Sequence, residues 1–199
     1  MAFSTFDELK DAIVEFTSEL NPSDPISTFI SLAEDEFFPV IKHYLGETTI
    51  VRVSANSAVE LPDDFSDARI LRVDGKLAVQ VSGYGAVLAH GQIGYFQSGK
   101  SYVLVPHSDT PRSVELTYYA KPQRLSVTNQ TNWVIEQFPA VYLYAALMQG
   151  FYWRGSDEAE AKASAKFDAA MGKVQADHYR AVNSGNQLVN NVGGFPYGD

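Results

Sequence analysis

The sequence predicts an α+β protein in which helices from both ends of the chain form a four-helix bundle and an antiparallel β unit is inserted between them. Two observations carry this prediction. Apolar residues recur every three or four positions near both ends, whereas the middle of the chain alternates with a period of two. The expected bundle comprises residues 1–46 and 129–184, and the inserted β domain comprises residues 47–128. Residues 185–199 are expected to form a flexible C-terminal tail.

The two N-terminal helices are bounded by local signals. Thr5 and Glu8 have the spacing of a capping box, in which each satisfies a backbone donor at the start of a helix. One apolar stripe then runs through residues 6–20. Asp24 is the expected N-cap of a second helix with Pro25 at its first position, and this helix is expected to end at Gly46.

The middle of the chain consists of short runs rich in β-branched and aromatic residues, separated by turn residues. Asp74-Gly75 between two such runs is a strong signal for a tight hairpin. We expect five or six antiparallel strands. The runs cover residues 48–55, 58–62, 68–73, 77–81, 101–106 and 113–119.

Helix returns after Asn132, which is a suitable N-cap, and Pro139 starts or kinks a longer helix. A last helix is expected after Ser156 or Asp157. On the longer helix the predicted buried face contains Tyr142, Ala145, Met148 and Tyr152. Tyr144 and Phe151 lie on the opposite face, where they are expected to be free to pack against a second protein.

The stretch Gly94–Ser101 has the spacing of a phosphate-binding P-loop. A P-loop opens a helix, because the helix start supplies free amides for the phosphates. Here Ser101 is followed by tyrosine, valines and then Pro106, which favour a strand. We therefore expect the turn of a β-hairpin, and a nucleotide-binding enzyme remains the unfavoured alternative.

No other pattern in the chain indicates catalysis, a cofactor or a metal. The chain has no cysteine and its four histidines are far apart, so thiolate and paired-histidine metal sites are not expected. Asp63, Asp64 and Asp67 lie close together but lack the further ligands of a calcium loop, and we expect a capped acidic turn. The N-terminus does not resemble a signal peptide, and no apolar run is long enough to span a bilayer.

The charge of the chain is −9 and is concentrated near the N-terminus, where residues 1–45 hold nine acidic side chains against Lys10 and Lys42. A protein that binds nucleic acid through its phosphates needs a basic surface, and no segment of the sequence is basic enough to supply one. An acidic surface is nevertheless compatible with DNA that passes nearby without binding.

Several short segments of the sequence, taken in order along the chain, resemble the head–tail adaptor (connector) proteins of tailed bacteriophages. They span most of residues 5–180, whereas the tail beyond Ser184 matches no motif. The segments are Thr5–Lys10, Ile26–Glu34, Val59–Phe65, Tyr102–Pro106, Leu116–Pro122, Thr131–Trp133 and Phe138–Leu147.

This resemblance implies a structural virion protein that is made in the bacterial host cytoplasm and lies at the head–tail junction. It implies a homo-oligomeric, commonly dodecameric ring beneath the portal protein, which extends the DNA channel and carries tail or nozzle proteins. It also implies that no residue is catalytic. The remaining alternative is another virion component, such as a stopper or tail-tube protein.

The C-terminal tail is the expected partner-binding segment. We expect it to become ordered on contact with a partner, as segments without a core of their own do. The docking residues on the portal would be Gly193, Gly194, Phe195, Pro196 and Tyr197, with the two aromatic residues as anchors.

Overall fold

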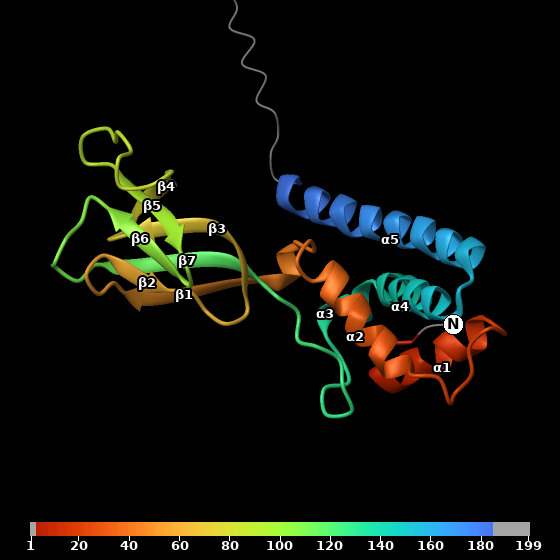
Figure 1. Ribbon diagram of the computed structural model, residues 1–199. Coiled ribbons are helices and arrows are strands. Elements are labelled where there is room, and N and C mark those ends of the chain that lie inside the picture. Colours follow the sequence, from red (N-terminus) through yellow and green to blue (C-terminus); the bar gives the residue numbers. More distant parts are fainter. Residues whose placement is uncertain (1–2, 185–199) are drawn as a thin grey trace, which may run out of the picture.

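The computed structural model describes residues 3–184, and within them the chain forms five α-helices and seven strands. Helices gather at one end of the molecule and strands at the other (Figure 1), so the α+β class is confirmed. The helices are α1 (Phe6–Phe16), α2 (Ile26–Phe37), α3 (Trp133–Gln137), α4 (Pro139–Arg154) and α5 (Asp157–Asn183), with a 3-10 turn η1 (Tyr44–Gly46). The strands are β1 (Glu47–Val53), β2 (Ala58–Glu60), β3 (Phe65–Val73), β4 (Lys76–Gln80), β5 (Ile93–Ser98), β6 (Ser101–Val105) and β7 (Ser113–Ala120).

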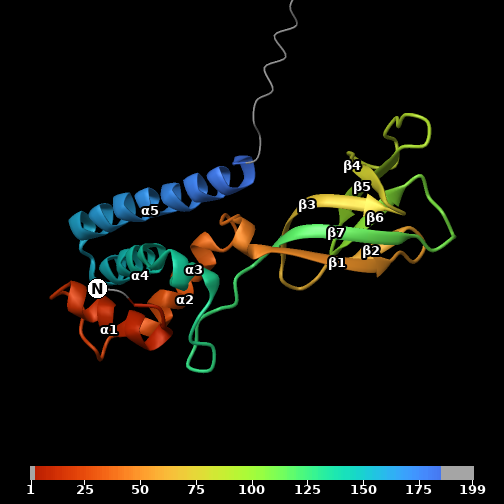
Figure 2. The ribbon, with the colours of Figure 1, turned by 180° about the vertical axis from the view of Figure 1, so that it is seen from behind.

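The structure does not confirm a four-helix bundle in which the helices pack evenly on one another. Instead α4 is a central helix, and α1, α2 and α5 lie around it (Figures 1 and 2). Phe37 of α2 packs edge-on against Tyr142 of α4, with ring centroids 5.0 Å apart. On another side of α4, a Cβ added to Gly150 would lie 2.7 Å from Leu20, so the segment after α1 approaches α4 closely.

The central position of α4 corrects the predicted faces of this helix. Nine of its residues are buried, on all sides of the helix, so its apolar surface is not a single stripe. Phe151, predicted to be free for a partner, is buried, and Tyr144 is half-buried against Phe16. Tyr152, predicted to be buried, is 73% exposed. A stripe rule assumes one neighbouring layer, whereas α4 has neighbours on several sides.

The helix boundaries follow local chemistry, including one signal that the prediction missed. The Thr5–Glu8 capping box is present, and Asn132 accepts hydrogen bonds from the first amides of α3, as predicted. The second helix ends at Phe37 rather than Gly46. Pro39 explains the difference, because a proline cannot donate the backbone hydrogen bond that would continue the helix. Asp24 does not cap α2; its carboxylate accepts from Asn21 N instead.

The seven strands form one sheet in the order β1-β7-β3-β4-β5-β6-β2. The predicted hairpin at Asp74-Gly75 is confirmed, with both residues at positive φ. Every neighbouring pair is antiparallel except β4 and β5, which are parallel and correct the prediction of a purely antiparallel unit. The twelve residues 81–92 connect this pair, which is the length that a parallel crossover requires.

Each end of the molecule has its own cluster of buried apolar side chains. The helical cluster is built from α1, α2, α3, α4 and α5, and the second cluster from the strands. The chain passes between them through residues 38–46 and 121–132, and the C-terminal end of α5 reaches toward the sheet (Figure 1). We call this region, where His43, Trp133 and His178 meet, the joint.

Candidate functional site

The P-loop-like stretch forms the β5–β6 hairpin, as predicted. Ser98 and Ser101 are paired across the turn, and Gly99 has a φ of 59°, a value that favours glycine. The Lys100 side chain is 94% exposed and lies 4.0 Å from Asp63. A strand follows the turn, so no helix start faces a phosphate at this position.

The three carboxylates of the acidic turn have separate partners. Asp64 accepts a hydrogen bond from the Tyr118 hydroxyl at 3.0 Å, and Asp67 pairs with Lys42. Within residues 3–184 no three acidic or histidine side chains are grouped closely enough to hold a metal ion. Asp64 therefore links two parts of the β unit, whereas Asp67 links the sheet to the segment that follows α2.

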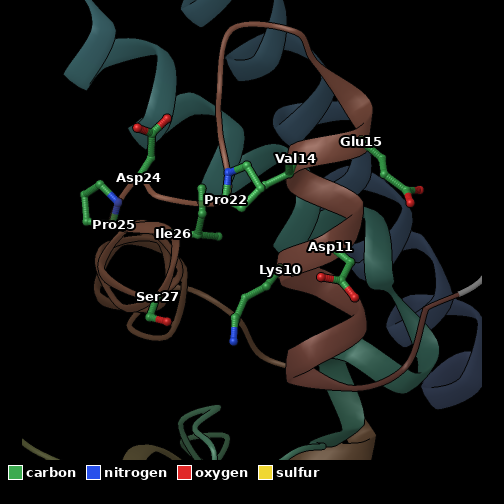
Figure 3. A pocket seen from close by; sticks show the side chains of 9 residues that line it. All are labelled: Lys10, Asp11, Val14, Glu15, Pro22, Asp24, Pro25, Ile26 and Ser27. Atoms are coloured by element: carbon green, nitrogen blue, oxygen red, sulfur yellow. The ribbon is translucent and has the colours of Figure 1, made fainter.

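A groove of about 610 Å³ lies between α1 and α2. Figure 3 shows Lys10 and Ser27 directed toward each other across it, and Asp11 and Glu15 of α1 also line it. Asp24, at one end, is paired with Arg154. The Lys10 ammonium is paired with Asp7 at 3.1 Å and makes no hydrogen bond with Ser27 within the described structure, so the groove shows no activated nucleophile.

A buried polar network fixes the segment that returns from the sheet to the helices. Glu34 of α2 is 1% exposed and accepts hydrogen bonds from Leu125 N at 2.7 Å and the Tyr142 hydroxyl at 3.0 Å. Asn132 donates to the same hydroxyl at 2.6 Å. Burial raises the pKa of Glu34, against these hydrogen bonds and the nearby Arg124, which lower it.

Sequence reasoning did not find this network. A glutamate within a strongly acidic stretch is typical of a protein surface. The two hydrogen-bond partners of Glu34 are also 91 and 108 positions away in the sequence. Its position on the apolar stripe of α2, next to Ala33 and one turn from Ile30, was the available signal.

The joint holds a second buried polar group. His43 is 1% exposed and its ring stacks on Trp133, with centroids 5.2 Å apart. Its Nδ1 accepts the Leu45 backbone N–H, so its Nε2 carries the proton and donates to Asp177 of α5 at 3.2 Å. Burial lowers the pKa of His43, although Asp177 opposes the shift. The neutral ring thereby ties α5 to the segment that precedes β1.

A comparison with protein families assigns the chain. A family model described as "SU10 adaptor protein" matches residues 4–188, which include all five helices and all seven strands of the described structure. The chain belongs to the SU10 adaptor protein family. This family consists of bacteriophage structural adaptors, which are typically not enzymes. No curated protein matches the chain.

Two further observations concern the binding predictions for this SU10 adaptor family member. Among the helices of residues 3–184, none combines the length and apolarity that crossing a bilayer requires. The predicted docking residues Gly193 to Tyr197 lie outside the described residues, so that prediction stays a prediction.

Proposed function

We propose that this protein is the head-to-tail adaptor of a tailed bacteriophage. It forms a homo-oligomeric, dodecameric ring beneath the portal protein, at the head–tail junction of the virion. The ring extends the DNA channel and provides a platform for tail or nozzle proteins. The observation that carries the proposal is the SU10 adaptor family match over residues 4–188, which covers both the helical part and the sheet.

The charge of the protein supports a channel through which DNA passes without specific binding. The net charge is −9, and many of the cations are already paired with carboxylates. Lys42 pairs with Asp67, and Arg154 lies 2.7 Å from Asp24. Cations engaged in this way are poorly available for phosphates, and an acidic wall repels the DNA backbone.

The partner-binding part of the proposal concerns residues 193–197. In this proposal Phe195 and Tyr197 insert into the portal as aromatic anchors, because buried aromatic side chains contribute a large share of the binding energy at protein interfaces. Pro196 between them restricts the backbone, which lowers the entropy lost on docking.

Native mass spectrometry of the protein co-expressed with the portal encoded in the same genome tests the role. We expect a discrete complex with many adaptor copies on each portal ring. Intact portal rings without bound adaptor would contradict the proposal and would favour a stopper or tail-tube component.

A truncation after Ser184 tests the docking residues. The truncated chain is expected to leave the portal ring unloaded, while its circular dichroism and melting temperature match the full chain. Full loading by the truncated chain would refute the role of residues 193–197 without affecting the adaptor role.

A further inference from the structure

The helix α5 leaves most of its surface without a partner inside the described chain. It has 27 residues, of which only Ala163, Phe167, Ala170, Met171 and Val174 are buried. These five form a narrow stripe that packs on α4, and Phe167 also contacts Phe37 of α2. A long helix held along one stripe has a wide exposed surface, and such a surface is available for a contact with another protein.

One flank of α5 borders an apolar groove of about 260 Å³. Tyr144, Leu147 and Phe151 of α4 line it, and Phe16, which is 57% exposed, contacts Tyr144 edge-on at its margin. An exposed aromatic ring beside apolar side chains favours burial by a partner.

The other margin of this groove is basic. Lys162 and Lys166 lie one helical turn apart on it, and Lys173 continues their row on the same flank of α5. Lys162 is paired with Glu158 at 2.6 Å, whereas Lys166 and Lys173 have no ion pair among residues 3–184. Cations at i and i+4 repel each other by roughly 0.2–0.5 kcal/mol. Contact with an acidic partner would offset this repulsion between Lys162 and Lys166.

A matching acidic row lies on α1 of the same chain. Asp7, Asp11 and Glu15 are exposed at successive turns of the helix, and Figure 3 shows Asp11 and Glu15 projecting from α1 beside the α1–α2 groove. Asp7 pairs with Lys10 at 3.1 Å, whereas Asp11 and Glu15 have no ion pair within the described residues. The row spans roughly 12 Å along α1, comparable with the roughly 17 Å from Lys162 to Lys173.

We propose that the acidic row of α1 in one copy docks against the basic margin and apolar groove beside α5 in the next copy. The two rows lie on different helices, α1 and α5, with α4 between these helices (Figure 1). A contact between two different surfaces of one chain is head-to-tail, and repeated contacts of this kind close into a ring or grow into a filament. The inference rests on the proposed function, which requires a ring.

The absence of cysteine from the chain allows a direct test by cross-linking. One variant carries Asp11→Cys on α1, and a second carries Ala169→Cys, which lies within the lysine row between Lys166 and Lys173 and keeps all three lysines. Both positions are exposed. With a short bismaleimide we expect covalent dimer only when the two variants are mixed, because a head-to-tail contact joins unlike surfaces.

The matched control replaces Ala169→Cys by Gln175→Cys, which is exposed on the same helix but roughly 120° around it. Dimer yield in the mixture should fall several-fold with this control. It should also fall several-fold at about 1 M salt, where the screening length is only about 3 Å. Equal yields with both partners, or dimers from either variant alone, would overturn the proposal.

Charge reversal separates this inference from the adaptor role. On portal rings, Lys166→Glu and Glu15→Lys are each expected to lower adaptor loading several-fold, and the double variant is expected to restore it. Normal loading of both single variants would refute the α1–α5 contact while the adaptor role stands. If the unmodified protein itself fails to load, the adaptor role fails, and cross-linking of the free protein still decides the contact.

Discussion

Single residues hold the segments of this adaptor together where the chain changes direction. Asn132 both caps α3 and donates to the Tyr142 hydroxyl, and Glu34 accepts from that hydroxyl and from Leu125 N. The cap was predictable because its partners lie two and three residues away. For Glu34, its place on the apolar stripe of α2 indicated burial, but its partners could not be predicted because they lie about a hundred positions away.

Replacing Glu34 by alanine is expected to destabilise the fold, because two buried hydrogen-bond donors lose their acceptor. Glu34→Ala removes the acceptor of both Leu125 N and the Tyr142 hydroxyl, and each buried donor left unpaired costs roughly 1–3 kcal/mol. The free energy of unfolding should therefore fall by about 2–6 kcal/mol. Glu34→Gln keeps an acceptor oxygen and should change it by less than about 1.5 kcal/mol at neutral pH. Urea unfolding monitored by circular dichroism measures both.

The same pair of variants gives a pH dependence with a definite sign. Because burial raises the pKa of Glu34, the folded protein binds this proton more tightly than the unfolded chain does. Its contribution to stability is therefore lost as the pH rises from the unfolded value, about 4.3, through the raised folded value. The difference between the original protein and Glu34→Gln should follow this trend, and a constant difference over pH 4–7 would contradict the assignment.

At the scale of elements, the sequence predicted what depends on near neighbours and missed what depends on distant ones. The apolar stripe of α1 from Phe6 to Ile13, the Thr5 capping box and the Asp74-Gly75 hairpin are local and were predicted. The predicted stripe continued through Phe16, which is 57% exposed. Pro39 was also a local signal, and overlooking it made the second helix too long. The parallel β4–β5 pair and the burial of α4 on all sides follow from long-range packing, which periodicity alone does not contain.

The β5–β6 hairpin should behave as a turn and not as a nucleotide site. Lys100→Ala alters an almost fully exposed side chain and is expected to change the free energy of unfolding by less than about 0.5 kcal/mol. Gly99→Val places a branched side chain at positive φ and should cost about 1–2 kcal/mol. ATP with Mg²⁺ should not alter the melting temperature. Stabilisation of the original protein but not of Lys100→Ala would instead establish a P-loop.

At the scale of the whole molecule, the two apolar clusters of residues 3–184 have no helix or strand in common. Glu47 and Tyr119, at the two ends of the β unit, are register partners on β1 and β7. Such partners lie about 5 Å apart, so the β unit leaves and rejoins the helical part at nearly one point. A Cβ on Gly46 would approach the Ala120 carbonyl oxygen to 3.3 Å, which reflects the same closeness.

This geometry predicts that the two parts fold independently. Residues 47–121 alone should give a β-type circular dichroism spectrum and a cooperative melt, because the cluster of Val59, Leu104 and Leu116 is complete within them. The remaining chain, with Gly46 joined to Pro122 by two or three glycines, should keep its helical spectrum and a cooperative melt. A fragment that begins at Ser54 and so lacks β1 is the control, and it should be less stable because β7 loses a neighbour. If neither part melts cooperatively, the protein is a single folding unit, and the contacts of His43 with Trp133 and Asp177 at the joint are needed for both.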